Sequence, residues 1–379
     1  MKKILFGALC ASMLLASCGG SENSGSKEVP FTEAGMLSLI KTPEGQPITL
    51  EEYEALFLNY AKAEIDPKSL DLKNNAVDSA LRTLSNRKCK LPSTTDEFRT
   101  KMLSNAAPQV RGKVMEKFGG LFGESGDNVK KVVAVLKDEK DPYVIKKGIR
   151  AISNELRKAP EAANYVIAQS KSDNPEVRRV AAVSLANSWS KGVDGVVDAV
   201  RALMNDPDKT VRGVALRGAG ELEDESLIDD LEKVLNDPAQ EASHGDAMSG
   251  IYGFWYDYPF HKHTSKKAYD VAYNYLSKKP RTDKVPYWTS IGELSNRAES
   301  SIDAWKSMAT FYKDSEWVKL MADLAADPNV NWLGRTAAVR VIAKIGTKDD
   351  LTKLQKTVEG LQNDSKQKFV LDEITKSLK

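Results

Sequence analysis

The chain has 379 residues, of which 28% are charged, and its 55 Lys and Arg residues nearly balance its 53 Asp and Glu residues. The net charge of +2 excludes a protein that binds nucleic acid or anionic lipid headgroups through a strong basic field. With only three cysteines, the chain must draw its stability from an apolar core and not from a disulfide framework.

Residues 1–17 have the pattern of a signal peptide. Lys2 and Lys3 precede an apolar run from Ile4 to Leu15, and the small residues Ala16 and Ser17 follow it. The run is about 12 residues long, whereas a helix that spans a bilayer needs about 20, so we expect this segment to target the chain and then be removed. Removal takes away two lysines and no acid, which brings the net charge to about zero.

The segment Leu15-Ala16-Ser17-Cys18-Gly19 resembles the lipobox of bacterial lipoproteins. The resemblance implies that Cys18 carries a diacylglyceryl group, becomes the first residue of the mature chain and holds it on a membrane, since two or more acyl chains anchor a protein stably. Gly after the Cys resembles an outer-membrane address, so we expect a lipid-anchored protein of the bacterial cell envelope, in the outer membrane. The alternative is an ordinary secretory signal that is cleaved after Ser17.

Residues 18–30 follow as the lipidated Cys and a tether rich in Gly, Ser and Asn, a composition typical of a flexible linker. Cys89 then remains as a lone thiol, which we expect to be a small buried apolar side chain.

Residues 31–106 are predicted to form a helical N-terminal cap. Thr49 and Glu52 have the spacing of a capping box ahead of Tyr53, Leu56 and Phe57. A second helical pattern runs over residues 76–84.

Residues 107–238 contain regular repeats. Valines at positions 110, 144, 177 and 211 each follow a Pro by two to four residues, and they are about 33 to 34 residues apart, the length of a helical hairpin unit. Each start is followed by apolar residues at helical spacing, and Asp or Asn before the Pro is suited to cap the helix. Small residues such as Ala181, Ala215 and Gly218 let helices approach closely, so we expect the hairpins to stack.

Asp206-Pro207, Val211-Arg212, Ala215-Leu216 and Ala219-Gly220 together resemble a HEAT or HEAT-like repeat. The resemblance implies an all-α fold, an α-solenoid of HEAT-like helical hairpins with helical N- and C-terminal caps. In that family an Arg after the Val pairs with an acid of the neighbouring repeat and forms a ladder. The resemblance assigns this role to Arg111, Arg178, Arg212 and Arg335, whereas Ile145 stands at the matching position of the second unit.

The pattern becomes irregular in residues 239–326, which we expect to hold irregular helical repeats with an aromatic and histidine-rich segment. It returns in residues 327–379 as a terminal HEAT-like repeat, and residues 365–378 have the mixed pattern of a capping helix.

The irregular region contains the candidate site residues. His244, His261 and His263 are the three histidines of the chain, and with nearby carboxylates they could hold a metal ion. Tyr252, Trp255, Tyr256 and Tyr258 could stack on a sugar or hold a peptide. The alternative for both sets is an irregular loop whose aromatic rings fill a break in the solenoid.

Motifs of catalysis do not appear in the sequence: it has no nucleophile elbow, phosphate loop, dinucleotide fingerprint or His-Glu-x-x-His. Gly218-Ala219-Gly220 is better explained by helix packing, and no His is followed by the Glu of di-iron HEAT-like enzymes. We therefore expect a non-enzymatic protein–protein interaction scaffold with no cofactor, a protein partner of unknown identity and no nucleic acid. A ligand- or glycan-binding lipoprotein that uses residues 252–260 is the alternative, and a metal-dependent enzyme at the histidines is a third hypothesis.

Overall fold

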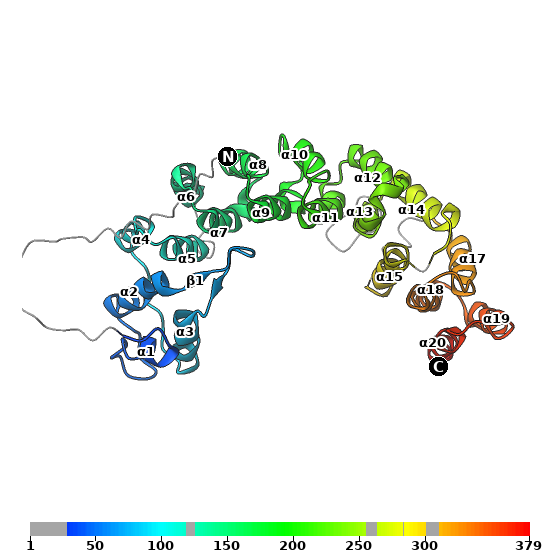
Figure 1. The fold of residues 1–379 in the computed structure, drawn as a ribbon, viewed down its shortest axis with the longest axis horizontal. Coiled ribbons are helices and arrows are strands. Elements are labelled where there is room, and N and C mark those ends of the chain that lie inside the picture. The colour runs from blue at the N-terminus through cyan, green and yellow to red at the C-terminus, as the bar shows by residue number, and fades with distance from the viewer. Residues whose placement is uncertain (1–28, 119–125, 255–263, 283, 301–310) are drawn as a thin grey trace, which may run out of the picture.

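The computed structural model describes residues 29–118, 126–254, 264–282, 284–300 and 311–379. In this part of the chain, helices follow one another as stacked hairpins and form a curved arch (Figure 1). The predicted all-α solenoid is therefore confirmed. No helix among these residues is long and apolar enough to cross a membrane.

Two layers of helices build the arch, and Figure 1 shows one layer along its concave side. Consecutive helices of this inner layer pack on one another in the order α5 (Pro108–Phe118), α7 (Pro142–Ile152), α9 (Pro175–Leu185), α11 (Lys209–Gly218), α13 (His244–Gly253), α15 (Val285–Ser300), α18 (Trp332–Ile345) and α20 (Gln367–Leu378). The outer layer comprises α6 (Gly126–Asp138), α8 (Pro160–Gln169), α10 (Val196–Leu203), α12 (Ser226–Asn236), α14 (Lys266–Lys278), α17 (Asp314–Ala325) and α19 (Lys348–Glu359). The stack runs through the region whose sequence pattern is irregular, because α13 packs on both α11 and α15.

The N-terminal end consists of the short helices α1 (Glu33–Leu37), α2 (Leu50–Leu58), α3 (Ala76–Asn86) and α4 (Asp96–Leu103). The predicted capping box of α2 is present: the Glu52 amide donates to the Thr49 hydroxyl at 3.2 Å, and the Thr49 amide donates to the Glu52 carboxylate at 3.0 Å. Between α2 and α3, the strands β1 (Glu64–Ile65) and β2 (Leu72–Lys73) pair in an antiparallel hairpin. This hairpin was not predictable from the sequence, since two-residue strands are too short for an alternating pattern.

Helix starts in the inner layer follow the expected capping chemistry. The side chains of Asp141 and Asn174 accept hydrogen bonds from the first amides of α7 and α9, and Pro fills the first helical position in both. In α11 the capping residue is Asp208 and in α18 it is Asn331, so the Asp-Pro pairs at 206–207 and 327–328 lie before the helices and do not cap them.

Close helix contacts explain the glycines of the fourth regular repeat. A Cβ on Gly218 would lie 2.3 Å from the Ala186 carbonyl oxygen, and one on Gly220 would lie 2.5 Å from the Gly250 carbonyl oxygen. Both oxygens belong to the backbone, which cannot move aside as the end of a flexible side chain can. Only Gly therefore permits this close approach of the helices. The interpretation of Gly218-Ala219-Gly220 as a packing element is confirmed, and Cys89 is buried as expected.

Candidate interaction surface on the inner face

Arginines connect the turns between successive repeats. The Arg178 guanidinium donates to both carboxylate oxygens of Asp206, at 2.7 and 2.9 Å, and to the carbonyl of Ser172 at 2.9 Å. The carbonyl of Asp206 in turn accepts from Arg212 at 2.6 Å. Asp206 therefore links two repeats, because its side chain is held by one arginine and its backbone by the next.

The same device recurs at other predicted ladder positions, with one departure. Arg111 pairs with the carboxylate of Glu139 at 2.8 Å, and Arg335 lies 2.7 Å from the carboxylate of Asp364. Burial raises the pKa of Glu139, but the Arg111 and backbone hydrogen bonds outweigh it, so the pKa of Glu139 is lowered. Arg212 departs from the prediction: its Nε donates to the Ser243 hydroxyl at 3.3 Å in place of a carboxylate.

In contrast to the arginine ladder, the histidine and aromatic site predictions do not hold at the two positions that the structure describes, His244 and Tyr252. His244 is buried, with Nε2 3.1 Å from the Asp237 carbonyl and Nδ1 3.3 Å from the Tyr275 hydroxyl, so neither nitrogen is open to a metal. Tyr252 is fully buried and donates to the Ser290 carbonyl at 3.0 Å. The metal prediction for His244 and the ligand-contact prediction for Tyr252 are therefore wrong, because packing against neighbouring helices uses both side chains.

The remaining members of these sets lie outside the described residues: Trp255, Tyr256, Tyr258, His261 and His263, as does Cys18. Within the described ranges, no group of three or more His, Cys, Asp or Glu side chains could hold a metal ion.

A buried lysine joins the hairpin to the inner layer. Lys146 of α7 is fully buried, and its Nζ lies 3.1 Å from the Asp71 carboxylate, 2.9 Å from the Glu176 carboxylate and within hydrogen-bond distance of the Ser69 carbonyl. Asp71 and Ser69 belong to the tip of the β1–β2 hairpin, which Figure 1 shows beneath α7 on the concave side. A buried ammonium ion needs such a full set of partners, so the hairpin is fixed at this place.

More ion pairs extend this cluster along the inner face. Lys147 contacts Asp71 at 3.5 Å and Glu116 at 3.0 Å, and Lys113 contacts Glu116 at 3.2 Å and Asp78 at 2.8 Å. Burial raises the pKa of Asp71, but the hydrogen bond and charge of Lys146 and the neighbouring cations outweigh it and lower the pKa. Asp71 is thus ionised, as is Glu116, because burial raises the pKa of Glu116 but Lys113 and Lys147 outweigh burial and lower it. The N-terminal end of the inner face is therefore a dense ionic network.

Next to this network, a cleft of about 290 Å³ opens between α7 and α9. Its polar wall contains Arg150, whose side chain is 49% exposed and lies 4.0 Å from Asp71, and Arg179, which pairs with Glu176. Its apolar wall contains Val183 and Trp189, which are 46% and 54% exposed. Further lining comes from small polar residues: Ser153, Asn154, Ser184 and Asn187. Trp189 was not predicted as a site residue, because a single aromatic residue in a turn produces no periodic pattern in the sequence.

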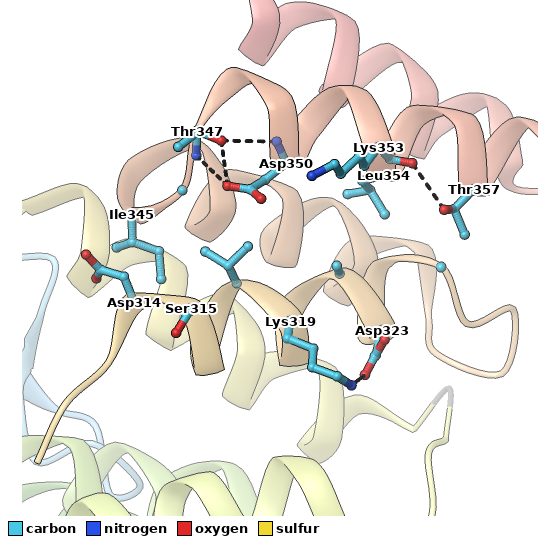
Figure 2. Close-up of a pocket in the computed structure, with 14 residues that line it drawn as sticks. Asp314, Ser315, Lys319, Asp323, Ile345, Thr347, Asp350, Lys353, Leu354 and Thr357 are labelled. Atoms are coloured by element: carbon cyan, nitrogen blue, oxygen red, sulfur yellow. Dashed lines mark hydrogen bonds and ion pairs between the residues drawn. The ribbon is translucent and has the colours of Figure 1, made fainter.

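A larger groove of about 580 Å³ lies in the outer layer between α17 and α19 (Figure 2). Ile345 and Leu354 contribute to its apolar lining. Its rim is charged, but these side chains bond within their own helices: Lys319 pairs with Asp323 at 3.0 Å, and the Asp350 carboxylate accepts from the Thr347 hydroxyl at 2.7 Å. Because the polar groups of the rim already have partners within the rim, this groove offers a binding partner fewer polar contacts than the cleft on the inner face.

Comparisons with known proteins agree with this architecture. A family model described as HEAT repeats matches residues 163–244. Among solved structures, Kap121p aligns over 87% of this chain with a TM-score of 0.50 and 13% identity, and this chain spans 37% of Kap121p. An archaeal HEAT-like repeats protein from Thermococcus onnurineus NA1 aligns over 64% of this chain and 100% of its own length, with a TM-score of 0.34 and 14% identity. No curated protein sequence matches the chain.

The chain therefore contains HEAT-like repeats, and its fold is a HEAT-like α-solenoid. At these identities the solved structures show the fold alone. The fold is of a kind that serves as a scaffold for protein interactions.

Proposed function

We propose that this chain is a non-enzymatic scaffold for protein–protein interaction, held by lipid on Cys18 at the outer membrane of a bacterial cell envelope. The observation that carries the proposal is the inner face, where helices from α5 to α20 lie side by side along one concave surface (Figure 1). Stacked repeats present such a surface without catalytic groups, and its length suits a protein partner more than a small molecule.

The membrane part of the proposal rests on the lipobox-like segment that ends at Cys18. Bacteria that express the chain are grown with labelled palmitate, and wild type is compared with Cys18→Ser. We expect the wild-type protein to incorporate the palmitate label and to be recovered in the membrane fraction, and Cys18→Ser to do neither. Label that persists in Cys18→Ser, or none in wild type, would contradict the anchor while leaving the scaffold untouched.

The scaffold part is tested with a photo-crosslinking amino acid placed at single positions of the full chain in living cells. Val183 on the inner face is compared with Lys353 on the outer helix α19, since both side chains are exposed. We expect a discrete protein adduct from position 183 and none from position 353. Adducts that are the same at both positions, or absent at both, would sink the scaffold proposal.

A ligand- or glycan-binding lipoprotein gains no support from the described residues, because Tyr252 is in the core. Its other aromatic residues lie outside the described part of the chain.

A further inference from the structure

We propose that the cleft between α7 and α9 binds an extended segment of the partner protein that carries a carboxylate side chain and, a few residues away, a large apolar one. The inference rests on the proposed scaffold function and names the chemistry that the scaffold recognises. It is carried by the charges, the exposed apolar side chains and the fixed backbone of one cleft.

The ionic network and the cleft together carry more positive than negative charge. Five cations meet four carboxylates in the ionic network and cleft: Lys113, Lys146, Lys147, Arg150 and Arg179 against Asp71, Asp78, Glu116 and Glu176. The excess positive charge lies at Arg150, because the nearest carboxylate, that of Asp71, is 4.0 Å away and the Arg150 side chain is half exposed. A guanidinium in this position presents a planar set of donors that matches a carboxylate.

The chain itself supplies the second argument. The hairpin tip places the Asp71 carboxylate on the cations of α7 and the Ser69 carbonyl on Lys146. An acidic loop in a non-helical conformation is thus already accommodated on this face, through one side-chain carboxylate and one backbone carbonyl. The cleft continues from Arg150 away from the hairpin, so a partner segment with the same chemistry fits beside it without displacing it.

The apolar wall gives the third argument. Val183 and Trp189 are two of the most exposed large apolar side chains among the described residues, and they line the same cleft as the arginines. An exposed Trp in a cleft that also contains arginines is the kind of residue that anchors interfaces, because covering its ring removes a large apolar area from water.

Hydrogen bonds fix the turn that presents Trp189. Its amide donates to the Asn187 side chain at 3.2 Å, the neighbouring Ser190 hydroxyl donates to the Ser184 carbonyl at 2.7 Å, and Arg157 donates to the Ser188 carbonyl at 2.8 Å. A ring on a fixed backbone loses little conformational freedom on binding, which favours affinity.

The test uses the full mature chain in detergent micelles and an array of unstructured synthetic peptides. We expect enrichment of peptides with an Asp or Glu near an aromatic or large aliphatic residue. For the best peptide, changing its acid to the amide is expected to weaken binding about tenfold or more, the effect of losing a charge-assisted hydrogen bond.

Variants of the chain locate the binding site. Arg150→Gln and Trp189→Ala are each expected to weaken the same peptide about tenfold. The matched controls Arg82→Gln and Phe369→Ala change an exposed arginine and an exposed aromatic residue outside the cleft, and they should leave affinity unchanged. All four positions are exposed, and thermal unfolding followed by circular dichroism verifies that each variant folds.

The inference is overturned if no peptide is enriched, if neutral or basic peptides are preferred, or if Arg150→Gln and Trp189→Ala bind as the controls do. Binding of a single-stranded oligonucleotide that the same two variants abolish would also overturn it. A discrete adduct at position 183 without acid-dependent peptide binding would refute this inference alone, whereas the loss of both would refute the scaffold as well.

Discussion

The arginine ladder allows a quantitative prediction, because one rung has a carboxylate and the next has none. Arg178 is 15% exposed and Asp206 is 6% exposed, so their bidentate ion pair is nearly buried. Removing one partner of a buried pair costs about 3–5 kcal/mol, since a charge is left without compensation. Arg178→Ala should therefore lower the free energy of unfolding by that amount.

Arg212 is the matched control from the neighbouring repeat. Its guanidinium donates to the Ser243 hydroxyl and to the Asp206 carbonyl, and no carboxylate is stranded when it is removed. The expected cost of Arg212→Ala is about 1–3 kcal/mol, the range for lost hydrogen bonds that leave a neutral partner unsatisfied.

Urea unfolding of the full mature chain in detergent, followed by circular dichroism, measures both costs. Amide hydrogen exchange of residues 172–174 reports on the turn that Arg178 holds. A double-mutant cycle with Asp206→Ala should give a coupling energy of about 1–3 kcal/mol. Equal costs for Arg178→Ala and Arg212→Ala, or a coupling energy near zero, would refute the conclusion that the Arg178–Asp206 ion pair stabilises the boundary between these repeats.

Three further predictions follow from local contacts. The hydrogen bond from the Thr42 side chain lowers the pKa of Glu52 from 4.5 to about 2, so the stability that Glu52 contributes should be lost as pH falls through this window; the difference in melting temperature between wild type and Glu52→Gln should shrink accordingly. Lys146→Met should free the β1–β2 hairpin, seen as faster proteolysis at residues 66–71, and unchanged cleavage would contradict its role. Gly218→Ala should destabilise the chain in thermal melts. Gly292→Ala, whose Cβ would meet nothing within 4 Å, should stabilise it by up to about 1 kcal/mol. A more stable Gly218→Ala than Gly292→Ala would contradict the packing role of Gly218.

Repeat period and helix starts were predictable from the sequence because they depend on local chemistry. A Pro in the first turn preceded by Asp or Asn begins α7 and α9 where the pattern indicates. The start of α11 was harder to predict from the sequence, because aspartates flank Pro207 on both sides. The one that caps is Asp208, since Asp206 is held by Arg178 across the repeat boundary, and only the fold decides between them.

Burial of single side chains was the least predictable property of the candidate site. Tyr252 and Trp189 are both large aromatic residues, yet one is fully buried and the other is 54% exposed. Aromatic density drew attention to Tyr252, but density does not distinguish a core from a surface. Trp189 lies in the short helical turn of residues 188–190 after α9, outside the helices of both layers, and it lines the cleft without being covered.

The place of the cleft follows from how the N-terminal end closes the solenoid. The hairpin and α3 of the N-terminal end supply Asp71 and Asp78 to the buried Lys146 of α7 and the buried Lys113 of α5. Carboxylates from the cap, together with Glu116 of α5, thereby neutralise the lysines of α5 and α7, whereas Arg150 lies at the edge of the network, 4.0 Å from Asp71 and half exposed. The open part of the inner face thus begins with an incompletely paired arginine, and an acidic partner segment would extend the pairing that the cap begins.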